Sequence, residues 1–367
     1  MTDTVGIIMT GDNDARLAEL TRVRSVAALP VAGRYRLIDF TLSGMVNSGI
    51  SNVGVTTRSN YRSLMDHLGS GKEWDLNRKL YGLRILPPYI QGGEQYRGDM
   101  DVLHGIKTFL EHSKQKYVLI AHGDILYNPR FEALQQAHID SGADITVMYN
   151  YGLCNSCGAR ISVENDRVTD IEAHPERPEQ CARLLGIYFM EKELLCRQIA
   201  YCYGRGLHDF LMDVLVRNIG KMNIGAFRYD GYAGKIDSVN AYYHCNMQML
   251  EASVRKELFF NENFIYTKVK DTVPTYYSDS AVVEDSVIAD GCRIEGRVER
   301  SIIFRGVHIA KGAVVTNSIV MQNSVIQRDV ALDYAVLDKG VTVGQGKRIG
   351  GLPRRYANAA VISSTHQ

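Results

Sequence analysis

The first two thirds of the chain alternate between short apolar runs and segments with helical spacing of apolar residues. The apolar runs predict buried strands over 5–9, 51–56, 117–121, 144–149, 184–190 and 224–228. Helices are predicted over 61–68, 129–141, 207–219 and 241–260, and a hairpin over 161–171. Strands that alternate with helices indicate a doubly wound, mostly parallel α/β sheet with both faces covered. In such a sheet, ligands bind at the C-terminal ends of the strands.

The pattern changes near residue 280, where aliphatic residues begin to recur at intervals of six. These positions are Val282, Ile288, Ile294, Ile303, Ile309, Val315, Ile326, Leu332, Leu337 and Val343. The period is typical of a hexapeptide β-helix, in which three short strands form each coil and the aliphatic residues fill the axis. The interval slips between Ile294 and Ile303 and again near Val320, which we interpret as loop insertions at coil corners. Two packed sheets are the alternative, but the spacing persists through several coils.

We therefore expect an α/β domain over 1–260, a linker over 261–279 and a β-helix over 280–367. Of the 367 residues, 45% are hydrophobic and 23% charged, and the net charge of +1 gives no reason to expect binding to nucleic acid or membranes. No apolar run approaches the ~20 residues of a membrane span, and no secretory signal pattern is present. Seven scattered cysteines are typical of reduced thiols, so we expect a cytoplasmic protein.

The loop after the first strand is the first candidate site. Residues 10–14 read Thr-Gly-Asp-Asn-Asp and lead into a helical pattern at Ala15. A strand–loop–helix opening binds phosphate through the backbone N–H groups at the helix N-terminus. Asp12 and Asp14 oppose a triphosphate there, because each unit-charge repulsion at ~4 Å is about 1 kcal/mol in water and about 4 kcal/mol at an effective dielectric near 20.

The tract over 33–50, GRYRLIDFTLSGMVNSGI, resembles the sugar-nucleotide pyrophosphorylases, and most closely the glucose-1-phosphate adenylyltransferases. The segment HLGSGKEWDLNRK over 67–79 is similar to the second, GlgD-type subunit of that family. The resemblance implies a nucleotidyltransferase domain followed by a left-handed β-helix. It also implies conversion of ATP and glucose 1-phosphate to ADP-glucose and pyrophosphate with magnesium, in bacterial glycogen synthesis.

Several positions depart from the nucleotide-binding motifs that the resemblance implies. The family loop runs roughly GGRGTRL. Gly11 and Arg16 match it, whereas Asp12 and Asp14 stand where glycines are expected. The lysine of the family's AKPAVPF-like segment falls on Val26. The frame of the family is therefore retained, and we expect a weakened triphosphate site in which Arg16 is vestigial.

The metal site that the resemblance implies is also altered. Asp124, after an apolar strand, matches the family's metal-binding aspartate, although an aspartate in this position is more often a turn or helix cap. The second metal-binding aspartate falls on Lys235, whose charge repels a cation. Asp237 could replace it only if the backbone shifted, which we do not expect. We therefore expect magnesium to serve the assembled enzyme without being bound productively by this chain.

The substrate-like pocket implied by the resemblance comprises Gly11, Tyr96, Arg97, Gly98 and His174. His174 takes the place of a phosphate-binding lysine and, with a usual pKa near ~6.5, is mostly neutral at pH 7. Tyr96-Arg97-Gly98 is intact, but Asp99 follows it in place of threonine.

The GRYR segment holds a candidate effector site. Arg34, with Arg36 two residues on, matches a lysine that binds anionic sugar-phosphate effectors in relatives. A solvent-exposed strand edge is the alternative. Elsewhere, the CxxC pair Cys154 and Cys157 lacks the second pair of ligands that a zinc site needs.

These features together predict a GlgD-type subunit with a degenerate active site. Its expected partner is a catalytic paralogue in a heterotetramer, and its expected contribution is regulation and assembly. The alternatives are an independent pyrophosphorylase of low activity or altered substrate, and a protein that senses sugar phosphates. A trimeric hexapeptide acyltransferase is disfavoured by the N-terminal sheet domain.

Overall fold

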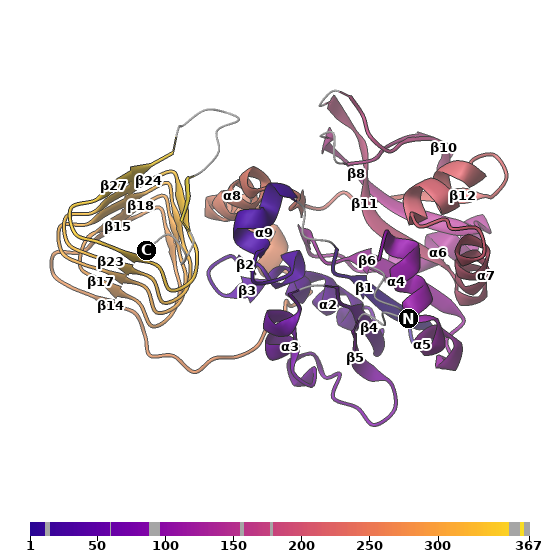
Figure 1. The fold of residues 1–367 in the computed structure, drawn as a ribbon, viewed down its shortest axis with the longest axis horizontal. Coiled ribbons are helices and arrows are strands. Elements are labelled where there is room, and N and C mark those ends of the chain that lie inside the picture. Colours follow the sequence, from indigo (N-terminus) through magenta and orange to yellow (C-terminus); the bar gives the residue numbers. More distant parts are fainter. Residues whose placement is uncertain are drawn as a thin grey trace.

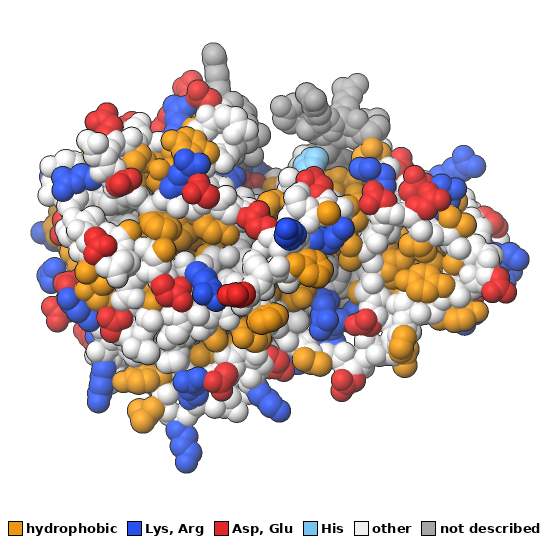
Figure 2. All heavy atoms as spheres, turned by 180° about the vertical axis from the view of Figure 1, so that it is seen from behind, with side chains coloured by type: hydrophobic (Ala, Val, Ile, Leu, Met, Phe, Trp, Pro, Cys, Tyr) orange, Lys and Arg blue, Asp and Glu red, His pale blue; other side chains and the backbone are white. Residues whose placement is uncertain are grey.

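The computed structural model describes residues 1–11, 15–58, 60–87, 96–154, 158–176, 179–351 and 360–362. Within these ranges an α/β domain lies beside a three-sided stack of short strands, and helices α8 (Val239–Met247) and α9 (Ala252–Phe259) lie near the junction (Figure 1). The predicted α/β class and hexapeptide β-helix are confirmed. On the opposite side, positive and negative side chains are interspersed (Figure 2), in keeping with the small net charge. In the described part of the chain, no helix is both long and apolar enough to cross a bilayer.

The first domain is built on a mixed sheet. Among the described residues its nine strands, in spatial order, are β5 (Gly82–Leu86), β4 (Asn52–Thr56), β1 (Thr4–Met9), β6 (Tyr117–His122), β11 (Glu179–Glu191), β8 (Ile145–Cys154), β12 (Ile224–Arg228), β10 (Arg167–Glu172) and β9 (Arg160–Glu164). β5, β4, β1 and β6 run parallel, as do β8 and β12. β11 runs antiparallel between β6 and β8, so the sheet is less uniformly parallel than the pattern indicates.

The two faces of this sheet carry separate hydrophobic cores, because successive strand residues point to opposite faces. On β1, Ile8 belongs to one core and Ile7 to the other. The first core includes residues of α2 (Leu37–Asn47), α3 (Arg62–Leu68) and α6 (Glu132–Ser141), and the second includes residues of α4 (Asp99–Gly105), α5 (Lys107–His112) and α7 (Lys192–Tyr203). A short α1 (Ala18–Thr21) follows the loop after β1.

Two predicted helices differ in the structure. The segment predicted over 207–219 forms a π-helical turn, Phe210–Leu215, followed by a 3₁₀ turn, Val216–Asn218. The helix predicted over 241–260 is two helices, α8 and α9. Glu251 between them adopts an extended backbone with φ −78° and ψ 124°, which interrupts the helical hydrogen bonding. The predicted hairpin is present, and its turn residues Asn165 and Asp166 have φ of 50° and 57°.

The second part consists of three parallel sheets that share an axial core. Among the described residues they are β14 (Tyr276–Tyr277), β17 (Arg293–Ile294), β20 (His308–Ile309), β23 (Val325–Ile326) and β26 (Thr342–Val343); β15 (Val282–Glu284), β18 (Arg297–Glu299), β21 (Val314–Thr316), β24 (Ala331–Asp333) and β27 (Arg348–Gly350); and β16 (Val287–Ile288), β19 (Ile302–Ile303), β22 (Ile319–Val320), β25 (Ala335–Leu337) and β28 (Ala360–Ile362). Strand β14 already lies among the residues predicted as linker.

The slips in the six-residue interval are shortened corners, so the prediction of loop insertions is wrong. Aligned residues such as Ile294 and Ile309 are 15 positions apart, and Ile309 and Ile326 are 17 apart. The corner between the second and third sheets has a residue with left-handed backbone in each coil, namely Asp285, Arg300, Asn317 and Tyr334, with φ of 41–50°. That conformation turns the chain in fewer residues.

The first coil also differs at one predicted core position. Val282 is 41% exposed because it aligns with Arg297 and Val314, whose column faces outward. Its neighbour Val283 aligns instead with the buried Val298, although in this first coil Val283 is itself 37% exposed.

The third sheet of the β-helix packs against the first domain, and the two share one hydrophobic core. Phe304 and Met321 from the coils belong to the same buried cluster as α2 and α8 residues. Arg24 forms a buried bidentate ion pair with Asp338, with nitrogen–oxygen distances of 2.7 and 3.1 Å. The Tyr243 hydroxyl donates to the Asn317 carbonyl oxygen at 2.6 Å. The two parts are thus joined through a substantial buried interface.

Candidate functional site

Asp124 and Lys235 face each other just beyond the C-terminal end of β6. Lys235 ends β13 (Ala233–Lys235), which pairs with β7 (Ile125–Tyr127) so that Lys235 lies opposite Ile125. The Lys235 Nζ is 4.0 Å from Asp124 Oδ2, and both side chains are about one fifth exposed. Asp124 Oδ1 is buried and has no hydrogen-bond partner among the described residues.

This arrangement does not fit a divalent cation. Among the described residues, no group of three or more His, Cys, Asp or Glu side chains could hold a metal. A cation beside Asp124 would also face the Lys235 ammonium. Unit charges of like sign ~4 Å apart repel by about 4 kcal/mol at an effective dielectric near 20, and a divalent ion doubles that.

The strand end next to this pair leaves room for a ligand. Gly11 has φ 69°, and a Cβ built on it meets no atom of the described residues within 4 Å. The Gly123 N–H donates to the Met9 carbonyl oxygen at 2.8 Å, which ties the Asp124 turn to β1. Asp12 and Asp14 lie outside the described residues. Arg16 is exposed, in a 3₁₀ turn that spans Ala15–Leu17.

Val26 fills the position where the resemblance places a lysine. It lies in a 3₁₀ turn, Val26–Ala28, is 4% exposed and belongs to the first core. The same 3₁₀ turn packs against the turn that carries Asp124, since a Cβ on Gly123 would lie 3.2 Å from the Ala27 Cβ. An apolar side chain therefore replaces a cation on this side of the site.

The Tyr96-Arg97-Gly98 segment positions the start of α4. A Cβ on Gly98 would lie 2.1 Å from the His208 carbonyl oxygen, so only glycine fits this close approach. The Arg97 N–H donates to Asp101 Oδ2 at 2.8 Å, while the Arg97 side chain is exposed and Tyr96 is half-buried against the second core. The contacts described for this segment are structural.

Asp99, the first residue of α4, places a second carboxylate near the strand ends. Its oxygens lie 3.4 Å from Arg58 Nη2 and 3.8 Å from His122 Nε2. Burial, and then the carboxylates of Asp99, Asp209 and Asp124, raise the pKa of the Tyr188 hydroxyl. That hydroxyl therefore stays protonated at neutral pH.

His174 lies in acidic surroundings on the hairpin. It is exposed and lines a hollow of about 430 Å³ with Arg160, Glu172, Glu176 and Glu179. The Arg160 guanidinium bonds to both Glu172 and Glu179. The net charge around His174 thus disfavours a phosphate in the described conformation.

A second candidate site lies between the two parts of the molecule. It is a cleft of about 590 Å³, and six of its lining residues are cationic, namely Arg34, Arg36, Lys268, Lys270, Arg305 and Lys339. None of the described lining residues is Asp or Glu. Arg305 is only 7% exposed, yet its Nε and Nη2 atoms have no hydrogen-bond partner among the described residues. Buried donors of this kind need an acceptor, and an anion in the cleft would supply it.

The crowding of positive charge shifts the pKa values of the cleft residues. Burial, followed by the charges of Arg36 and Arg24, lowers the pKa of Lys339 to about 7. Burial and neighbouring cations also lower the pKa of Lys270 and of Arg305. An anion bound here would be attracted by the cations and would restore their usual protonation.

Comparison with known proteins places the chain in a family. Residues 5–251 match the nucleotidyl transferase family, and residues 271–365 match the GlmU-like C-terminal hexapeptide family. The chain is 33% identical to the glycogen biosynthesis protein GlgD of Bacillus subtilis, over 95% of this chain and 92% of that protein. It is 39% identical to GlgD of Geobacillus stearothermophilus (85% and 82% covered) and 34% identical to the glucose-1-phosphate adenylyltransferase of Thermotoga neapolitana (86% and 77% covered). The chain belongs to the ADP-glucose pyrophosphorylase family.

In this ADP-glucose pyrophosphorylase family member, the structure brings some predicted site residues together and separates others. Asp124 and Lys235 lie close together, with 4.0 Å between Asp124 Oδ2 and Lys235 Nζ. Arg34 and Arg36 both line the cationic cleft, although Arg34 is itself exposed. His174 lies in its own hollow, with no described contact to Asp124.

Sequence reasoning missed most of the cationic cleft. Arg305, Gln322 and Lys339 line it from one corner of three successive coils, 17 residues apart. The aligned strands follow the same 17-residue repeat, so the coil register is a signal that could have grouped these residues. Asp99 with Arg58 and His122 was also not predicted as a cluster.

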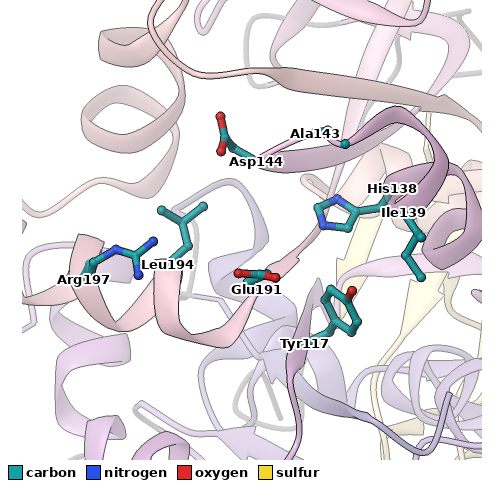
Figure 3. A pocket seen from close by; sticks show the side chains of 9 residues that line it. Tyr117, His138, Ile139, Ala143, Asp144, Glu191, Leu194 and Arg197 are labelled. Carbon is teal, nitrogen blue, oxygen red and sulfur yellow. The ribbon is translucent and has the colours of Figure 1, made fainter.

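One further hollow lies at the other end of the sheet. Side chains from β6, α6 and α7 surround a space of about 340 Å³. Tyr117 and Glu191 are among the residues that line it (Figure 3). Tyr117 begins β6, whereas Asp124 follows its end, so this hollow is separate from the adenylyltransferase-like site. His138 in it donates or accepts a hydrogen bond with Thr146 Oγ1 at 2.8 Å, and burial lowers its pKa.

Proposed function

We propose that this chain is a GlgD-type subunit of a bacterial glucose-1-phosphate adenylyltransferase, with regulation and assembly as its main roles. The observation that carries the proposal is the Lys235 ammonium 4.0 Å from Asp124, at the position where the family resemblance places a second metal-binding carboxylate. Transfer of an adenylyl group needs cations to neutralise the phosphates. With a lysine at this position and Val26 in the core, the chain alone has little or no turnover.

The proposed partner is a catalytic paralogue in a heterotetramer. In that complex the partner holds magnesium and converts ATP and glucose 1-phosphate to ADP-glucose and pyrophosphate for glycogen synthesis. This chain supplies subunit surfaces and a regulatory site. The similarity to two proteins named GlgD, over most of both chains, supports this assignment.

Two other functions fit part of the same observations. The identity to the Thermotoga neapolitana adenylyltransferase favours an independent pyrophosphorylase of low activity. The cationic cleft favours a sugar-phosphate sensor that needs no catalytic partner.

A co-expression experiment separates the three functions. ADP-glucose formation is assayed for this chain alone, for the catalytic paralogue alone and for both together, and size-exclusion chromatography at micromolar concentration tests for a complex. We expect a stable complex whose activity or effector response differs from that of the paralogue alone. Separate elution with unchanged kinetics would favour the sensor, and turnover by the isolated chain equal to that of the paralogue would favour the independent enzyme.

We further propose that the cationic cleft, with Arg34 and Arg36, is the site of an anionic sugar-phosphate effector. Arg36 is already partly engaged, since its Nη1 donates to the Ser63 carbonyl oxygen at 2.5 Å and its N–H donates to Asp39 Oδ2 at 2.9 Å. Arg34 is exposed at the cleft and its guanidinium lies 5.8 Å from the centre of the Tyr35 ring. Arg34 is thus positioned to contact a ligand.

Arg34→Ala tests the effector site in the assembled enzyme. Loss of a charge-assisted phosphate contact costs about 1.5–3 kcal/mol, so effector activation should require about tenfold or more higher effector concentration. The basal rate should stay near that of the unsubstituted complex. Arg22→Ala, at an exposed arginine outside the cleft, is the matched control. An unchanged activation curve for Arg34→Ala would make Arg34 a solvent-facing residue.

A further inference from the structure

The Lys235 ammonium has hydrogen-bonding capacity that the folded chain does not use. An ammonium carries three donors, and its 4.0 Å separation from Asp124 Oδ2 exceeds the length of a hydrogen bond. Lys235 makes no hydrogen bond with any described residue, and its side chain is 19% exposed. The group is therefore partly desolvated and still free to donate to an anion.

Backbone hydrogen bonds hold the segment that carries this ammonium in place. Lys235 pairs with Ile125 in the β13–β7 ladder, and the N–H of the next residue, Ile236, donates to the Asp124 carbonyl oxygen at 2.9 Å. Asp124 and Lys235 thus sit on two segments that are bonded to each other. The backbone that carries the lysine therefore needs little reorganisation when a ligand binds.

The location is that of a ligand site in an open α/β sheet. Asp124 follows the C-terminal end of β6, and Gly11 follows the end of the neighbouring β1, where a Cβ built on it meets no atom of the described residues within 4 Å. The Arg183 guanidinium lies further along β13, where it donates to the Ala233 carbonyl oxygen at 3.0 Å, two residues before Lys235. An anion here would meet positive charge that offsets the Asp124 carboxylate.

We propose that Lys235 takes the place of a divalent cation, so that this site binds the phosphate group of a sugar phosphate or sugar nucleotide without metal. The choice of ligand rests on the proposed function, whose substrate and product share that phosphate. No covalent step is involved. The chain would hold the ligand as a bound state and would not turn it over.

Calorimetric titration of the isolated chain with glucose 1-phosphate, and separately with ADP-glucose, tests the proposal. Each titration is run in excess EDTA and again in millimolar magnesium. We expect at least one probe to bind with a dissociation constant that agrees within about twofold between the two conditions. Lys235→Ala should weaken that binding by about tenfold or more, because a charged donor is lost. The two probes distinguish a sugar-phosphate site from one that also needs the nucleotide.

Three variants make the outcome specific. Arg305→Gln alters the cationic cleft, so binding that is lost with Arg305→Gln but kept with Lys235→Ala belongs to that cleft and would overturn the proposal. Lys311→Ala, at an exposed lysine of the β-helix, controls for a general charge effect. Lys235→Asp should create a carboxylate pair with Asp124 and bind Mn²⁺ in electron paramagnetic resonance titrations, whereas the unsubstituted chain should not.

Binding that requires magnesium, or no detectable binding of either probe at millimolar concentration, would also overturn the proposal. These outcomes are independent of complex formation with the paralogue, which is measured by chromatography. Metal-free binding without a complex would therefore retain this inference while the subunit proposal fails.

Discussion

Lys339 is partly buried among the cations of the cleft. The groups that face it are Arg24, Arg36 and Lys270, together with the single carboxylate of Asp338. That carboxylate is already bound by Arg24. Burial and these cations disfavour the charged ammonium, so its pKa in the folded protein, about 7, lies well below the usual 10.5. The folded state is thus penalised while Lys339 is protonated, and this contribution to the free energy of unfolding becomes more favourable as pH rises from about 7 towards 10.5.

An anion reverses this preference, which gives a pH dependence of binding. Sulfate remains a dianion between pH 6 and pH 9 and binds the protonated cleft, so its affinity should fall as pH rises above about 7, with proton uptake on binding. Titration calorimetry in buffers of different ionisation enthalpy measures both quantities. Lys339→Gln should bind more weakly and with a flatter pH profile, whereas Lys347→Gln, at an exposed coil lysine, should behave as the unsubstituted chain. If the sulfate affinity of Lys339→Gln depended on pH as steeply as that of the unsubstituted chain, the titrating group would be another residue.

The departures of single residues from the family's motifs were predictable from the sequence where a residue replaces one of opposite chemistry. Lys235 and Val26 stand out in the sequence because a metal site needs a carboxylate and a triphosphate site needs a cation. The resemblance implied that Lys235 and Asp124 lie near each other, whereas the strand pairing of β13 with β7 that brings them together was not predictable. The grouping of positive charge at Arg305 and Lys339 was likewise not predictable, because it depends on which corner of the coils faces the first domain.

At the scale of elements, the β-helix shows which features a repeat imposes. Axial positions demand aliphatic side chains, so the six-residue interval predicted the coils. The corners do not demand a residue type, since Arg300 and Tyr334 adopt left-handed backbone as Asn317 does. Corner lengths therefore leave no clear pattern. The place of the antiparallel β11 between β6 and β8 was equally hidden, because strand order is set by long-range packing.

Gly296 lies at the shortest corner of the β-helix, where Ile294 and Val298 are only four residues apart. A Cβ there would lie 2.4 Å from the Ala313 carbonyl oxygen and 2.8 Å from that of Ala310. Gly296→Ala should therefore destabilise the chain by about 1–3 kcal/mol, because the neighbouring coil backbone must shift.

Urea unfolding at fixed protein concentration measures the effect. Gly344→Ala is the matched control, since a Cβ on Gly344 would meet only the end of Lys347 at 3.7 Å. Equal urea midpoints for the two variants would contradict this prediction, because the corner would then accommodate a Cβ at Gly296.

At the scale of the whole molecule, the junction makes the sheet domain and the β-helix one structural unit. They share a hydrophobic core, and the Arg24–Asp338 pair is buried within their interface, with each side chain 6% exposed. Removing one partner from a buried ion pair leaves an uncompensated charge, whereas replacing both by apolar groups is often neutral.

Arg24→Met should accordingly lower the free energy of unfolding by about 3–5 kcal/mol. Among the described residues, the Asp338 carboxylate then keeps one hydrogen bond, from the Lys339 N–H at 2.7 Å. The double variant Arg24→Met/Asp338→Leu should recover most of that loss. A double-mutant cycle of urea unfolding curves gives the coupling between the two positions. Additive losses would mean that the charges are solvated and act independently.

The 17-residue coil also sets the spacing of the contacts along the junction between the two parts of the molecule. Arg305 contributes to the cleft two coils before Lys339, whose neighbour Asp338 is held by Arg24. Gain or loss of one coil between them would keep the aliphatic column continuous, yet would move Asp338 by one strand spacing of roughly 4.8 Å. Arg24 would then no longer pair with Asp338, and the cleft cations carried by the coils would no longer align with Arg34. The number of coils between Arg305 and Lys339 is therefore fixed by these contacts with the first domain, a constraint that the aliphatic spacing of the coils does not impose.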